Sequence, residues 1–103
     1  MESIRHASTL WRWTGGNDRS WFFLTIDGDA GDLLSATRLM RRLERGAGKG
    51  FGSIKVFARI GDSRWQTSVF PQKGSGWLLP VKAAIRRAEA IDEGDAVDLV
   101  LEL

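Results

Sequence analysis

Alternation of apolar and polar positions predicts strands, most clearly in the second half of the chain. Residues 54–60 and 64–70 alternate with a period of two and flank the turn sequence Gly61-Asp62-Ser63. Their β-branched and aromatic side chains suit an antiparallel pair. Residues 97–103 also alternate, with valine and leucine on one side, and predict a terminal strand.

The alternation is weaker in the first half. Residues 1–8 have no periodicity and predict a frayed end. Residues 9–13 alternate, and the Gly-Gly-Asn-Asp turn that follows predicts a hairpin with residues 21–26. That second segment is apolar at nearly every position, as expected of a strand covered on both sides or forming a barrel wall. Residues 77–79 predict a short strand before Pro80.

Two segments have the helical period. The first is predicted to begin with Asp32 as its N-cap and to end before Gly46. The second has Pro80 at its first position, where the fixed φ of proline suits a helix. The apolar positions that define these helices are Leu33, Ala36, Met40 and Leu43 in the first and Val81, Ala84, Ile85, Ala88 and Ile91 in the second.

About six short strands and two helices, without regular alternation between them, predict a mainly β fold. We expect a small closed six-stranded barrel with two short helices rather than a doubly wound sheet. A chain of 103 residues is long enough for one hydrophobic core. The predicted organisation is a frayed segment over residues 1–8 and a single barrel domain over residues 9–103.

The amino-acid composition excludes several kinds of functional site. The chain has no cysteine, which excludes disulfides, thiolate nucleophiles and cysteine zinc sites and fits a reducing compartment. It shows no signal peptide and no apolar run long enough to span a membrane, so a cytoplasmic protein is expected. The one histidine, His6, lies in the segment predicted to be frayed. We therefore predict no catalytic residues, no metal and no cofactor, and expect that the protein is not an enzyme.

Two loops invite ligand-binding interpretations that their spacing does not support. The glycine-rich residues 46–52 fit neither phosphate-loop motif and lead from a helix to a strand, the reverse of the order those motifs need. A helix stop followed by a barrel corner is the preferred interpretation. Residues 27–32 resemble the start of a calcium loop but lack its glycine and its bidentate glutamate. Acidic residues at the start of a helix explain that run better.

Charge is segregated along the chain, although the net charge is only +2. Residues 38–64 hold eight basic and two acidic residues, whereas residues 89–103 hold six acidic residues and neither Lys nor Arg. Two interpretations are open: the two segments complement one another in the fold, or the basic segment also faces an anionic partner.

Three segments carry a family resemblance. They are Gly48–Ser53, Ile60–Pro71 and Leu79–Glu89, followed by Glu93-Gly94-Asp95 and the terminal strand. In order and spacing they resemble a bacterial domain-of-unknown-function family, DUF1905. The resemblance implies a closed barrel of the double-split type, distantly like the swapped-hairpin transition-state regulators and antitoxins that bind DNA as dimers. Some family members carry a second domain of the bacteriocin-protection type, and the family brings no activity with it.

The resemblance also bears on oligomeric state. Regulator units of this kind are about half as long as this chain and complete their barrel by dimerising. This chain is long enough to form both halves itself, so we expect a monomer or a weak homodimer rather than a swapped dimer.

Five tryptophans lie on predicted strands or at their starts, where aromatic side chains mostly fill the core. The alternative places one or two of them beside cations at a barrel mouth, a setting for a planar or anionic ligand. Our first hypothesis is therefore a non-enzymatic binding module for a small anionic or aromatic ligand. Its predicted lining is Arg64, Trp65, Trp77, Lys82 and Arg86.

Two further hypotheses stay open. If the two helices are related by pseudo-symmetry, their paired arginines form one basic face that binds nucleic acid. These arginines are Arg41 and Arg42 in the first helix and Arg86 and Arg87 in the second. A protein-interaction accessory domain is the third hypothesis, and the two-domain members of the family support it.

Overall fold

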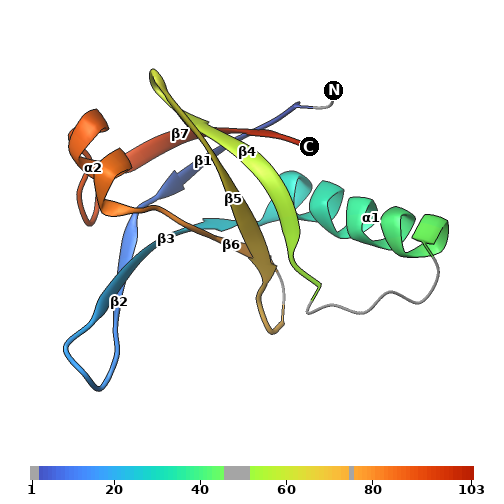
Figure 1. Ribbon diagram of the computed structural model, residues 1–103, viewed down its shortest axis with the longest axis horizontal. Helices are drawn as coiled ribbons and strands as arrows, with labels where there is room; N and C mark the ends of the chain where they lie inside the picture. The colour runs from blue at the N-terminus through green and yellow to red at the C-terminus, as the bar shows by residue number, and fades with distance from the viewer. Residues whose placement is uncertain (1–2, 46–51, 75) are drawn as a thin grey trace.

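The computed structural model describes residues 3–45, 52–74 and 76–103 (Figure 1). Within these ranges the chain forms seven strands and two helices. In chain order they are β1 (Ser3–Thr9), β2 (Trp11–Thr14), β3 (Ser20–Ile26), α1 (Gly28–Arg45), β4 (Ile54–Ile60), β5 (Ser63–Pro71), β6 (Trp77–Pro80), α2 (Ala83–Glu89) and β7 (Ala96–Glu102). Neither helix is long and apolar enough to cross a membrane.

The strands form one antiparallel sheet in the order β1-β7-β4-β5-β6-β3-β2, which curls into a half-barrel (Figure 1). A mainly β fold with two helices is confirmed, but the predicted closed six-stranded barrel is wrong. The strand predicted over residues 9–13 is divided between β1 and β2, because the ladder between β1 and β7 ends at Thr9. Leu10 N–H donates to Asp95 O at 2.9 Å, and Gly94 N–H donates to Leu10 O at 2.8 Å. The chain bends there, so β1 and β2 pair with different neighbours and lie at opposite ends of the sheet order.

The N-terminal segment differs from the frayed end predicted for residues 1–8. Ser3–Thr9 forms β1 and pairs with β7 along its whole length. Its inward side chains are Ile4, which is buried, and His6 and Ser8, which are half-buried. Two of these three side chains are polar and hydrogen-bonded. The segment therefore lacks the hydrophobic alternation that would predict a strand.

The core fills the concave side of the sheet. The inner positions of β4 and β7 are buried as their alternation predicts. Trp65 and Trp77 also belong to the core, with 8% and 1% of their surface exposed. The indole N–H of Trp77 donates to Ser35 Oγ at 3.1 Å, which links the sheet to α1.

Both helices begin at other residues than predicted. α1 begins at Gly28 rather than near Asp32, because Gly28 adopts a φ of +58° and turns the chain directly after β3. Pro80 is the last residue of β6 and not the first of α2, since it pairs with Phe23 in the ladder. The N–H of Val81 donates to Phe22 O at 2.8 Å, so the helix starts beyond it.

The glycine-rich loop falls outside the described residues except for Gly52, so the predicted barrel corner there stays a prediction. In the acidic run, Asp29 lies in the first turn of α1, as expected of acids at a helix start. The described residues contain no group of three side chains that could hold a metal ion.

The segregated charges meet in the sheet. The basic strand β4 lies between β5 and the acidic strand β7. Arg64 on β5 pairs with Glu102 on β7, with 2.7 Å between Nε and Oε1, and its guanidinium lies 4.1 Å from the ring centroid of Phe57 on β4. This arrangement supports the interpretation in which the basic and acidic segments complement one another.

The predicted strands of the β4–β5 hairpin are confirmed. The carboxylate of Glu89 on α2 binds at the turn of this hairpin. Ser63 donates to Glu89 Oε2 at 2.6 Å. Gly61 lies in the turn with a φ of +56°, and a Cβ atom there would overlap the Glu89 carboxylate. Glycine at 61 is therefore favoured by its backbone conformation, and a side chain there would displace the Glu89 carboxylate.

Gly28 is a matched control for Gly61, because its φ of +58° is nearly the same and a Cβ atom there would meet no other atom within 4 Å. We expect Gly28→Ala to lower the free energy of unfolding by about 1 kcal/mol, from backbone strain alone. Gly61→Ala should lower it by about 0.5–1.5 kcal/mol more, because the Glu89 carboxylate must move and lose its hydrogen bond from Ser63. Urea denaturation of both variants measures the difference, and equal losses would show that Glu89 is not the constraint.

Candidate functional site

The convex side of the sheet carries a group of aromatic side chains. On β3 the side chains of Trp21 and Phe23 point outward, opposite to the buried Leu24 and Ile26. On β2 the paired positions are also tryptophan: Trp11 lies opposite Phe23, and Trp13 opposite Trp21.

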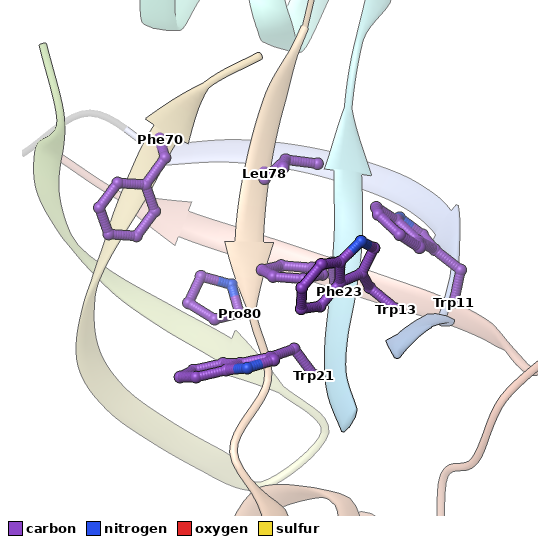
Figure 2. Close-up of a pocket in the computed structure, with 7 residues that line it drawn as sticks. All are labelled: Trp11, Trp13, Trp21, Phe23, Phe70, Leu78 and Pro80. Atoms are coloured by element: carbon purple, nitrogen blue, oxygen red, sulfur yellow. The ribbon is translucent and has the colours of Figure 1, made fainter. Parts of the chain in front are cut away.

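The group continues across β6 to β5. Pro80 on β6 pairs with Phe23, and Leu78 pairs with Phe70 on β5. Together these side chains enclose an open hollow of about 490 Å³ (Figure 2). We call this surface the aromatic face; its residues are Trp11, Trp13, Trp21, Phe23, Phe70, Leu78 and Pro80.

Three of these rings are unusually exposed. Trp13 and Trp21 each expose 51% of their surface and Phe70 exposes 44%. No charged side chain is among the residues that line the hollow. A contiguous apolar patch of this kind marks a binding surface more often than single exposed apolar residues do.

The ring of Trp11 is held in place. Its indole N–H donates to Thr25 Oγ1 at 2.9 Å. Its ring lies against that of Phe23, with 5.2 Å between centroids and a tilt of 37°. An indole fixed by a hydrogen bond and an aromatic neighbour loses little conformational freedom when a ligand binds.

The ring of Trp13 is positioned by the hairpin turn. A Cβ atom on Gly15 would lie 2.8 Å from Cη2 and 2.9 Å from Cζ3 of Trp13. The indole therefore packs directly over the glycine, and no other residue at position 15 leaves room for it. The neighbouring Gly16 has no such contact within 4 Å.

Trp21 and Phe23 point to the same side of β3. They are two residues apart, which separates their Cα atoms by about 6.6 Å. Figure 2 shows both rings nearly edge-on, with Pro80 beside Phe23. The two side chains are therefore neighbours on the aromatic face.

A family model described as a domain of unknown function, DUF1905, matches residues 7–101. The chain belongs to this family. The resemblance drawn from the sequence is confirmed and extends over nearly the whole chain. No curated protein matches it. The family description names no activity, so the function of this DUF1905 domain has to be argued from its surface.

The predicted ligand-binding residues do not meet at one hollow of this DUF1905 domain. Trp65 and Trp77 are in the core, whereas Arg64 points outward from β5 to Glu102. Arg86 lies over the ring of Phe22, 3.7 Å from its centroid, and donates to a backbone carbonyl. Lys82 is exposed at the start of α2. A ligand role for these five residues stays a prediction.

The predicted nucleic-acid residues are also apart. Arg41 and Arg42 are on α1, and Arg86 and Arg87 are on α2. Figure 1 shows the two helices at opposite ends of the long axis of the molecule. The two arginine pairs therefore do not share one basic face, and the nucleic-acid alternative stays an untested prediction without that support.

None of the ligand-binding residues predicted from the sequence lies on the aromatic face, although a signal for this face was present. Trp11 and Trp13 precede a Gly-Gly turn, and Trp21 and Phe23 follow it, all at alternate positions. In a hairpin with this register the four rings share one side of the two strands. The missing information was that only the other side of β3 is covered by the core.

We expect Gly15→Ala to displace the Trp13 ring, because the added methyl group would occupy its position. In a ¹H–¹⁵N NMR spectrum the indole N–H signal of Trp13 should shift, while those of the buried Trp65 and Trp77 should not. Gly16→Ala is the matched control and should leave the Trp13 signal unchanged. A Trp13 signal that is the same in both variants would contradict this packing.

Proposed function

We propose that this domain is a non-enzymatic binding module and that the aromatic face holds the flat ring of a small, uncharged ligand. The observation that carries the proposal is the set of contiguous exposed rings on the convex side of the sheet. Trp21 and Trp13, each half exposed, are paired across β2 and β3. Burying such rings against a flat ligand removes apolar surface from water and adds stacking contacts.

The lining favours an aromatic ligand over an anionic one. All seven lining residues are Trp, Phe, Leu or Pro, so the hollow offers no cation to an anion. A charged group placed there would lose hydration without gaining a partner. Among the two ligand types expected from the sequence, the surface therefore supports the aromatic type.

The size and chemistry of the hollow support binding rather than catalysis. A volume of about 490 Å³ lies within the range of about 300–1,000 Å³ typical of small-molecule sites. None of the lining side chains is an acid, a base or a nucleophile that works near neutral pH. We accordingly assign no reaction step to this surface.

The fixed rings favour affinity for a rigid ligand. Trp11 is held by Thr25 and Phe23, and Trp13 packs on Gly15. Because these side chains are already ordered, binding costs little side-chain entropy. Trp21, for which the described residues show no side-chain hydrogen bond, is the ring best placed to adjust to the ligand.

Saturation-transfer NMR tests the proposal with matched flat and puckered probes. We expect nicotinamide, adenosine and indole to receive saturation from the protein, and cyclohexanecarboxamide, which has a puckered ring in place of the flat ring of nicotinamide, to receive much less. Trp21→Ala should weaken binding of the flat probes about 5- to 150-fold, because a lost stacking face is worth about 1–3 kcal/mol.

Phe57→Ala is the control for the loss of an aromatic side chain. Phe57 also points outward from the sheet, but it lies on β4 under Arg64 and outside the aromatic face. Its variant should bind the flat probes like the unaltered protein. The proposal is wrong if no flat probe binds, or if Trp21→Ala binds as tightly as Phe57→Ala.

A further inference from the structure

Thr25 lies at the end of the aromatic face without being one of its lining residues. Its side chain is on the convex side of β3, two residues after Phe23 and opposite Leu78 on β6. The β2–β3 ladder ends at the pair of Trp11 and Phe23, before it reaches Thr25. The hydrogen bond that the structure shows between Thr25 and β2 is made by the Thr25 hydroxyl.

Thr25 accepts hydrogen bonds at two atoms that serve different contacts. Its backbone carbonyl accepts from His6 Nε2 at 3.1 Å and from Ser8 Oγ at 2.9 Å, both on β1. Its hydroxyl accepts the indole N–H of Trp11 at 2.9 Å. Because the carbonyl belongs to the backbone, a change of side chain at this position can remove the contact with Trp11 and leave the carbonyl available to β1.

The methyl group of Thr25 fixes the direction of its hydroxyl. A Cβ atom on Gly76 would lie 3.8 Å from Thr25 Cγ2, so the methyl group is on the side of β6. A threonine side chain has few allowed rotamers, because its Cβ atom carries two heavy atoms. With the methyl group on the β6 side, the hydroxyl is directed to Trp11 at the start of β2.

We propose that the Thr25 hydroxyl is a positioning group for ligand binding, which sets the orientation of the Trp11 ring and thereby the affinity of the aromatic face for a flat ring. This proposal rests on the proposed function of that face. An indole side chain has several staggered rotamers, and contacts select among them. Here the bond to Thr25 and the tilted contact with Phe23 select the orientation in which Trp11 lines the hollow.

The strength of one hydrogen bond sets the size of the expected effect. Without this bond the Trp11 ring also occupies orientations that do not line the hollow. The apparent affinity then falls with the fraction of molecules that keep the binding orientation. A hydrogen bond of ordinary net strength changes such a ratio about 2- to 12-fold, so the loss of affinity should lie in that range.

Three variants separate the hydroxyl of Thr25 from its carbonyl. Thr25→Val keeps the shape of the side chain and removes the hydroxyl, Thr25→Ser keeps the hydroxyl, and Ser8→Ala removes a hydrogen bond to the carbonyl. Titration of each variant with nicotinamide and with indole, followed by NMR, measures the Kd. Thr25→Val should bind both probes about 2- to 12-fold more weakly, and Thr25→Ser within about twofold of the unaltered protein. Ser8→Ala should lower the urea midpoint of unfolding and leave the Kd unchanged.

The indole N–H signal of Trp11 reports the contact directly. In Thr25→Val this signal should shift and exchange faster with water, because the proton has lost its acceptor. The signal of Trp13 should keep its position. In Ser8→Ala the Trp11 signal should also stay in place. A role of Thr25 in stability alone would not move the Trp11 signal of the folded protein.

The outcomes distinguish this proposal from the proposed function. Equal affinities of Thr25→Val and Thr25→Ser overturn the proposal, and so does an unchanged Trp11 signal in Thr25→Val. A loss of affinity in Ser8→Ala as large as in Thr25→Val also overturns it, because the attachment of β1 would then be the cause. In these cases the unaltered protein still binds flat rings, and the proposed function stands. If the unaltered protein binds no flat probe, the proposed function is wrong and this proposal is wrong with it.

Discussion

Thr25 joins three strands, and the curl of the sheet depends on it. Its backbone carbonyl accepts hydrogen bonds from His6 Nε2 at 3.1 Å and from Ser8 Oγ at 2.9 Å, both on β1. Its hydroxyl accepts the indole N–H of Trp11 at 2.9 Å, at the start of β2. The β2–β3 ladder extends only from Ser20 to Phe23, so the edge of β3 at Thr25 is left to the side chains of β1. The two end strands of the sheet are thereby tied to the same point of β3.

This link between strands also shapes the aromatic face. The bond that fixes the Trp11 indole is made by the same residue that holds β1 against β3. The alternation of β3 then separates two environments, with Leu24 and Ile26 in the core and Trp21 and Phe23 on the convex side. A single strand therefore contributes to the stability of the domain with one face and to the proposed binding site with the other.

Exposed apolar side chains lie on two parts of the domain. The aromatic face is a hollow on the strands β2, β3, β5 and β6, whereas Leu39, Met40 and Leu43 are exposed on α1. The rings of the aromatic face suit a flat small ligand because they offer stacking contacts.

Local pattern alone determined the β4–β5 hairpin, the terminal strand β7 and the presence of two helices, because their alternation and turn residues act over short distances. It also identified the family, through the order of motifs from Gly48 onward. Other features depended on contacts between distant residues. β1 is a strand because its backbone pairs with β7 and because Thr25 O accepts hydrogen bonds from His6 and Ser8. The chain passes from β1 to β2 at Leu10, whose backbone bonds to residues 94 and 95. The local sequence pattern does not distinguish the buried Trp65 and Trp77 from the exposed Trp13 and Trp21. Only tertiary packing decides which side of each strand the core covers, because the exposure of a side chain depends on the elements that pack against it.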